Sequence, residues 1–197
     1  MIASPVYTEP LRVAQIMAGF RHPSFVCGGW AIDLFINRVS RQHQDVDIGI
    51  WRPDQLALRA YLVAHGWTPE KAIAGQRLPW PENEFINLPI HAISCKHPNA
   101  QPSRIEVLFN EASNGYFRFR RDLSITMPLA DAIVHSNAGV SILAPEIVLL
   151  YKAKDLTRAD NQRDFETVLP HLNPTRRAWL QAALLRMHPG HEWLRRL

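Results

Sequence analysis

Apolar residues recur along this chain with two different spacings, and the spacing predicts its helices and strands. Where apolar residues recur every three to four positions, a helix with one buried face is expected. Where they form short runs or alternate with polar residues, a strand is expected. Helices are predicted over residues 9–17, 30–36, 53–64, 145–156, 161–169 and 174–188, and strands over residues 25–27, 46–51, 84–95, 104–109 and 116–121.

The order of these elements predicts the fold class. Strands and helices mix in the first two thirds of the chain, whereas everything after Pro145 has a helical pattern. This order is typical of an α+β protein with a mixed β-sheet and flanking helices, followed by a C-terminal helical portion. We expect a core domain over residues 1–135 and a helical domain over residues 136–197. Because no Gly/Ser linker separates the two, the second is expected to pack on the first.

Composition narrows the class of protein. The chain has 197 residues, and its 47% of hydrophobic residues is enough for a sizeable core. The N-terminal segment lacks the basic and long apolar regions of a signal peptide, and no run approaches the roughly 18 apolar residues that cross a bilayer. Cys27 and Cys95 are not in a metal-binding spacing. We therefore expect a cytoplasmic protein without a membrane partner.

The net charge is +4, and two interpretations of it stay open. Much of the excess lies near the C-terminus, in Arg176, Arg177, Arg186, Arg195 and Arg196. A basic tail of this kind can bind nucleic acid. We favour the second interpretation, in which these arginines cover the solvent-facing side of amphipathic helices.

Two aspartates at the start of a predicted strand suggest a metal site. Asp45 and Asp47 are two residues apart, so they lie on the same face, about 6.6 Å apart along the strand. Carboxylates this close repel each other unless a cation or water separates them, and carboxylate oxygen is a preferred ligand of Mg²⁺. Glu106 stands in an apolar strand and is the candidate for a third acid. The alternative is that Glu106 faces solvent on an edge strand or pairs with Arg104 or Arg41.

Gly28 and Gly29 separate a short apolar strand from a helix. Glycine lets the backbone approach a ligand closely, and the free N–H groups of a helix N-terminus bind anions such as phosphate. The alternative is a tight strand-to-helix turn. Neither the dinucleotide-binding fingerprint nor the P-loop motif is present.

These motifs together resemble a known superfamily. The segments CGGWAIDLF at residues 27–35 and RQHQDVDI at residues 41–48, with a lysine-bearing segment at residues 144–155, resemble nucleotidyltransferases with the polymerase-β-type core. More narrowly, they resemble the aminoglycoside 2″-adenylyltransferase and lincosamide nucleotidyltransferase branch. The resemblance implies a nucleotidyltransferase-type mixed β-sheet. It covers most of the chain and is strongest at residues 25–50 and 144–165.

The resemblance also implies roles for the residues singled out above. Gly28 and Gly29 would hold the triphosphate of a nucleotide, ATP or another NTP, and Asp45 and Asp47 would hold two Mg²⁺ ions. Glu106, which stands where relatives carry Asp, would be a metal ligand or the general base. The implied reaction transfers a nucleoside monophosphate, AMP from ATP, to a hydroxyl group and releases pyrophosphate.

Two basic residues are candidates for nucleotide contacts. Arg41 either binds phosphate or balances the acids, and Lys152 either binds phosphate or lies on a solvated rim. His43 is a candidate partner for an aspartate of the metal site. The segment at residues 158–165 keeps the Arg, Asp and Phe of relatives but lacks their lysine.

Three functions remain open from the sequence. The first is an enzyme that acts on a small hydroxylated molecule, such as an aminoglycoside-like acceptor. Glu82, Glu84, Glu111 and Asp122 either line a pocket for the positive charge of such an acceptor or belong to an ordinary solvated surface. The second is a toxin-type nucleotidyltransferase that acts on tRNA or a protein. The third is a non-catalytic nucleotide-binding relative. The sequence leaves the acceptor and the oligomeric state open.

Overall fold

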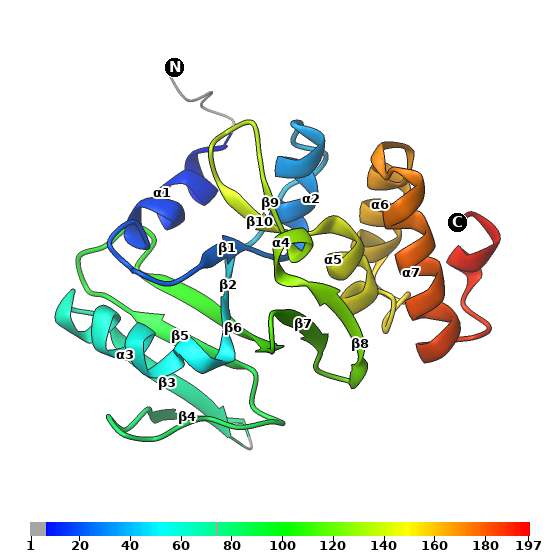
Figure 1. Cartoon of the computed structure of the whole chain (residues 1–197). Helices are drawn as coiled ribbons and strands as arrows, with labels where there is room; N and C mark the ends of the chain where they lie inside the picture. Colours follow the sequence, from blue (N-terminus) through cyan, green and yellow to red (C-terminus); the bar gives the residue numbers. More distant parts are fainter. Residues whose placement is uncertain (1–6, 74) are drawn as a thin grey trace.

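A ten-stranded mixed sheet forms the centre of the molecule (Figure 1). The computed structural model describes residues 7–73 and 75–197. The main path of the sheet runs β4-β3-β5-β6-β2-β1-β10-β9, and the β7–β8 hairpin pairs with β6. The strands are β1 Ser24–Val26, β2 Asp47–Trp51, β3 Thr68–Ile73, β4 Gln76–Pro79, β5 Ala92–Lys96, β6 Arg104–Ser113, β7 Tyr116–Phe119, β8 Asp122–Pro128, β9 Ile133–His135 and β10 Ser141–Leu143.

Helices flank this sheet and then continue alone to the C-terminus. Helix α3 lies near β3 at one end of the molecule, and α5, α6 and α7 gather at the other end, near α2 (Figure 1). The helices are α1 Thr8–Ile16, α2 Gly28–Ile36, α3 Gln55–Ala64, α4 Leu129–Ala132, α5 Pro145–Lys152, α6 Ala159–Val168 and α7 Pro174–Met187, with short 3₁₀ turns η2 Arg52–Asp54, η3 Leu169–His171 and η4 Glu192–Arg195. The predicted α+β class, with a mixed sheet, flanking helices and a helical C-terminal portion, is confirmed.

The neighbouring strands β2 and β6 place the acidic residues. They run parallel, and their register pairs Asp47 with Glu106 and Ile48 with Val107. Residues paired in this way share a face of the sheet, so the two acids lie on one face and the two apolar side chains lie on the other. Ile48 and Val107 are fully buried in the core, which fixes the register because a slip by one residue would expose them.

Helix α5 anchors the helical portion. Its apolar residues, Ile147 among them, are buried, and so is Glu146. Burial raises the pKa of Glu146, which accepts two hydrogen bonds of 2.7 Å from Arg176 on α7. A buried carboxylate needs such a partner, so this pair ties α7 to α5.

One predicted strand is largely wrong. Only the end of the range 84–95 is a strand, β5, and the residues before it form an irregular segment. The reason is that the side chain of Gln55 replaces a strand partner: it accepts a hydrogen bond of 2.7 Å from the Ile86 N–H and donates one of 3.1 Å to the Ile86 carbonyl. Pro89 also has no N–H to donate to a neighbouring strand. The patterns of β3, β4, β8, β9 and β10 were too short or too polar to be predicted.

The division into residues 1–135 and 136–197 stays a proposal. Strand β10 pairs in parallel with β1, so the sheet itself continues to Leu143, and the helical portion begins with α5. Among the described residues, no helix combines the length and apolar character needed to cross a membrane.

Candidate active site

Gly28 and Gly29 open helix α2 at the end of β1. Gly28 has a φ of 64°, a conformation that side chains disfavour, and a Cβ placed on it would lie 2.6 Å from Oδ2 of Asp47. A Cβ on Gly29 would collide with the guanidinium of Arg41 and the ring of His43. Both glycines therefore allow charged side chains to close over the start of α2. The first N–H groups of a helix lack partners within it, so this place suits an anion.

Asp47 is a half-buried carboxylate without a cationic partner. Among the residues that the structure describes, none forms an ion pair with it. Burial is the largest cause that raises the pKa of Asp47 from 3.8 to about 6, and the charge of Asp45 adds to it. Lys152 and Arg158 act in the opposite direction but do not cancel these effects. Asp47 is thus a site of uncompensated negative charge next to the helix N-terminus.

Glu106 is the register partner of Asp47, but its carboxylate pairs with another residue. Its charge contributes to the raised pKa of Asp47, and its carboxylate contacts the guanidinium of Arg77 on β4 at 3.5 Å. In residues 7–73 and 75–197, no three His, Cys, Asp or Glu side chains are already close enough to hold a metal ion together. The pair with Arg77 is partly exposed, with 45% and 30% of the two side chains accessible, and such pairs contribute only about 0–1 kcal/mol. The Glu106 carboxylate can therefore leave Arg77 at little cost.

The chemistry of the place fits Mg²⁺. Carboxylate oxygens are its preferred ligands, and a divalent cation would offset the charge that burial penalises at Asp47. Asp45 is exposed and Asp47 partly buried, so the two carboxylates lie between solvent and the core. Asp45 and Asp47 are the residues that would hold the ion.

A second group of charges is fully paired. Asp164 on α6 accepts hydrogen bonds from Nε and Nη2 of Arg41 at 2.8 and 3.0 Å, and it forms an ion pair of 2.9 Å with Lys152. Burial opposes ionisation of Asp164, but the hydrogen bond from Arg41 and the charge of Lys152 outweigh it, so the pKa of Asp164 is lowered. Arg41, whose pKa this pair raises, is thus held by α6 and contacts Asp160 at 3.6 Å.

His43 has a different partner from the one expected. Its Nε2 lies 2.7 Å from Oδ2 of Asp33 on α2, and its ring packs on Trp30 at 4.3 Å between ring centroids. Asp33 also accepts hydrogen bonds from Ser40, of 2.5 Å from its hydroxyl and 3.1 Å from its N–H. This cluster fixes the segment between α2 and β2, and so positions the start of the strand that carries Asp47.

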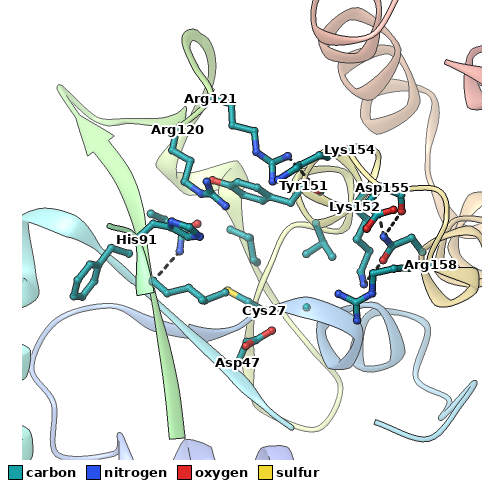
Figure 2. A pocket seen from close by; sticks show the side chains of 17 residues that line it. Cys27, Asp47, His91, Arg120, Arg121, Tyr151, Lys152, Lys154, Asp155 and Arg158 are labelled. Atoms are coloured by element: carbon teal, nitrogen blue, oxygen red, sulfur yellow. Dashed lines mark hydrogen bonds between the residues drawn. The ribbon is translucent and has the colours of Figure 1, made fainter. Parts of the chain in front are cut away.

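Two hollows meet at Asp47. The first, with a volume of about 390 Å³, lies between the sheet, the β7–β8 hairpin and α5 (Figure 2). The second lies over the start of α2 and is lined by Gly29, Arg41 and Asp45 among others. Both are lined by Cys27, Gly28, Asp47, Lys152 and Arg158. A ligand that spans the two would pass over the Asp47 carboxylate.

The family model for aminoglycoside-2″-adenylyltransferase matches residues 11–136, which is more than half of the chain. The chain belongs to the aminoglycoside-2″-adenylyltransferase family. It is accordingly a nucleotidyltransferase-type enzyme, as the motifs predicted. A comparison with curated proteins finds no match.

Solved structures support the family fold. The solution structure of the antibiotic-resistance factor ANT(2″)-Ia is 14% identical, with a TM-score of 0.61 over 97% of this chain and 98% of that one. The crystal structure of ANT(2″)-Ia in complex with adenylyl-2″-tobramycin is 13% identical, with a TM-score of 0.62 over 93% and 99%. The lincomycin-bound lincosamide antibiotic adenylyltransferase LnuA is 15% identical, with a TM-score of 0.55 over 82% and 94%. At these identities the likeness shows the fold.

The structure brings most of the predicted site residues of this family member together. The hollow over α2 is lined by six of them: Gly28, Gly29, Arg41, Asp45, Asp47 and Lys152. Glu106 lines neither hollow, although it is paired with Asp47 in the sheet register. The roles of these residues stay predictions.

Sequence reasoning assigned no role to four residues that line the hollows or hold their walls. Arg158 and Asp164 belong to a segment that resembles relatives, so that segment was the available signal. Arg120 and Arg121 line the hollow shown in Figure 2 and carried no local signal, because the strand that follows them was not predicted.

Proposed function

We propose that this chain transfers a nucleoside monophosphate, AMP from ATP, to a hydroxyl group of a small molecule in a Mg²⁺-dependent reaction. The observation that carries the proposal is the position of Asp47. It is a half-buried carboxylate without a cationic partner, it lies against the glycine that opens a helix, and it lies where two hollows meet. One ligand in each hollow, a nucleotide and an acceptor, would then meet above this carboxylate.

The nucleotide phosphates would lie over the start of α2. The free N–H groups at Gly28 and Gly29 are donors for phosphate oxygens, and the helix dipole favours negative charge there. Arg158 and Lys152 line the same hollow and add positive charge. Lys152 is held by Asp164 at 2.9 Å, so its ammonium group is already in place before a nucleotide binds.

Asp45 and Asp47 would hold the metal. Bound there, Mg²⁺ would offset the charge that develops on the phosphate oxygens during transfer. Two ions are the number that the superfamily resemblance implies. The register of β2 and the close approach to Gly28 would hold the Asp47 carboxylate in place, and the bound cation would favour its ionised form.

Glu106 is the proposed base. The acceptor oxygen attacks the α-phosphorus, its proton passes to the Glu106 carboxylate, and the bond to the β-phosphate oxygen breaks so that pyrophosphate leaves. Glu106 would reach the acceptor by leaving its weak pair with Arg77. The neighbouring register position of Asp47 keeps the base close to the metal.

The acceptor is a small hydroxylated molecule, for which the family description gives aminoglycosides as the first class to test. The cytoplasm is the proposed compartment, since both cysteines are free and ATP and Mg²⁺ are abundant there.

Pyrophosphate release from ATP in the presence of a panel of hydroxylated acceptors tests the proposal. Release is expected only with Mg²⁺ and an acceptor, and it should disappear in Asp47→Asn. The exposed Glu82→Gln is the matched control and should keep wild-type activity. Release that persists in Asp47→Asn, or after removal of divalent cations by EDTA, contradicts the mechanism.

A further inference from the structure

The hollow beneath the β7–β8 hairpin is lined by an excess of positive charge. Its lining includes two acids, Asp47 and Asp155, and five cations: Arg120, Arg121, Lys152, Lys154 and Arg158. Lys152 is paired with Asp164, which lies outside the hollow. In the described part of the chain, none of the other four cations forms an ion pair with a carboxylate.

Two of these cations belong to the turn of a hairpin. Phe119 pairs with Asp122, so Arg120 and Arg121 form the turn between β7 and β8. Both guanidinium groups lie near the ring of Tyr151 on α5, at 5.2 and 5.5 Å from its centroid. Figure 2 shows them on the side of the hollow away from Asp47, and Lys152 and Arg158 lie together at another side.

Stacking on Tyr151 explains the geometry of the two arginines but does not neutralise them. Burial, followed by the charge of Arg120, lowers the pKa of Arg121. His91 lines the same hollow, and its pKa is lowered by burial first and then by the charges that include Arg120 and Arg121. Both effects are consistent with the two arginines in this wall, which no carboxylate of the described residues pairs with, and a bound anion would offset their charge.

The acids that a polycationic acceptor would need are engaged elsewhere. Glu111 pairs with Arg52 at 2.6 Å, and Glu84 pairs with Lys71. Asp122 pairs with Arg186 at 2.5 Å, and it does not line the hollow although it follows Arg121 in sequence. None of the four candidate acids, Glu82 included, lines this hollow.

We propose that the acceptor of this enzyme carries an anionic group, a phosphate or a carboxylate, which Arg120 and Arg121 bind while a hydroxyl group of the same molecule reaches Asp47. The nucleotide triphosphate would already have the start of α2, Lys152 and Arg158 as partners, so the two hairpin arginines remain for the acceptor. This inference rests on the proposed function, because it assigns the hollow of Figure 2 to the acceptor. A polycationic aminoglycoside would meet like charge there.

Calorimetric titration of the full chain, saturated with Mg²⁺ and a non-hydrolysable ATP analogue, tests the inference without requiring catalysis. The probes are glucose 6-phosphate, gluconate, glucose and tobramycin. At least one of the two anions should bind about tenfold or more tightly than glucose, because one or two charge-assisted hydrogen bonds contribute that much. Tobramycin should show no binding. The better of the two anions identifies phosphate or carboxylate as the recognised group.

Variants connect this preference to the hairpin. Arg120→Gln combined with Arg121→Gln should remove the preference for the anion and leave the affinity for the ATP analogue unchanged. Arg118→Gln is the matched control, because Arg118 lies on the same hairpin, hydrogen-bonds Ser113 and does not line the hollow. Circular dichroism at matched temperatures checks that each variant is folded.

Three results would overturn the inference: tobramycin binding as tightly as either anion, an unchanged anion preference in the double variant, or loss of analogue binding in that variant. The proposed function fails separately. If no acceptor supports pyrophosphate release although the anion preference persists, the transferase proposal falls and the anion site stands. If tobramycin is adenylylated and the anions are not, the anion site falls and the transferase proposal stands.

Discussion

Asp47 is half-buried and Asp164 is buried, both lie in the field of the same lysine, Lys152, and their pKa values move in opposite directions. Asp164 is enclosed by Arg41 and Lys152, and its pKa is lowered. Asp47 has Asp45 as its neighbour, and burial raises its pKa to about 6. Burial penalises both charges, so the partners decide the outcome. The paired aspartate holds two segments of the fold together, whereas the unpaired one keeps its charge for a ligand.

The largest expected effect concerns activity. Asp47→Asn should lower kcat for nucleotidyl transfer about 10³-fold, because a lost metal ligand removes several kcal/mol of transition-state stabilisation. Steady-state assays of pyrophosphate release would measure it. A loss of kcat below tenfold in a folded Asp47→Asn variant would contradict the contrast between the two aspartates.

The next effect concerns the paired aspartate. Asp164→Ala leaves Arg41 and Lys152 buried together without their carboxylate, and the free energy of unfolding should fall by about 3 kcal/mol, with a Tm about 10 °C lower. Asp160→Ala is the matched control, since Asp160 is 49% exposed and lies 3.6 Å from the same arginine. Its loss should be below about 0.5 kcal/mol. Equal losses of unfolding free energy in the two variants would show that burial does not strengthen the pair with Asp164.

A third effect is a gain in the free energy of unfolding, where Asp164→Ala gives a loss. The folded protein holds the proton of Asp47 up to about pH 6, whereas the usual carboxyl pKa is 3.8, so this group's contribution to stability is lost as the pH rises through that range. Above pH 6 and without metal, Asp47→Asn should therefore be more stable than wild type by about 2 kcal/mol. Urea unfolding at several pH values would show this gain shrinking as the pH falls from 7 toward 4. A variant that is less stable than wild type at pH 7 would contradict the charge argument.

The smallest effect is in the pH profile of catalysis. Because Asp47 must be ionised to hold Mg²⁺, kcat/KM should fall about tenfold per pH unit below pH 6. Metal and proton compete for the same carboxylate, so more Mg²⁺ should move the midpoint to lower pH. A midpoint that does not respond to Mg²⁺ would assign the acidic limb to another group.

The half of the site near β1, α2 and β2 could be predicted because its elements follow one another directly. Gly28 and Asp47 are separated by one helix and one short loop, so their meeting follows from local patterns. The alternation in residues 104–109 also indicated Glu106, and the register beside Asp47 agrees with that expectation. Its pair with Arg77 was not predictable, because the polar strand β4 has no apolar pattern.

The other half depends on contacts that are distant in sequence. Arg41 and Asp164 are 123 residues apart, and only the docking of α6 joins them. Arg120 and Arg121 enter the hollow because a hairpin folds over Tyr151, and β8, its second strand, has exposed apolar residues that obscure its pattern. Local periodicity predicts elements but does not predict how a hairpin meets a helix. The charge of the hollow beneath the hairpin therefore becomes known only from the fold.

The binding of Mn²⁺ in the presence of a non-hydrolysable ATP analogue, followed by electron paramagnetic resonance at pH 7.5, tests the central claim most directly. We expect the wild-type chain to bind Mn²⁺ together with the analogue, and Asp45→Asn and Asp47→Asn each to weaken that binding about tenfold or more. Glu82→Gln should bind as the wild type does. Equal Mn²⁺ affinity in the wild type and in both aspartate variants would show that these carboxylates hold no metal.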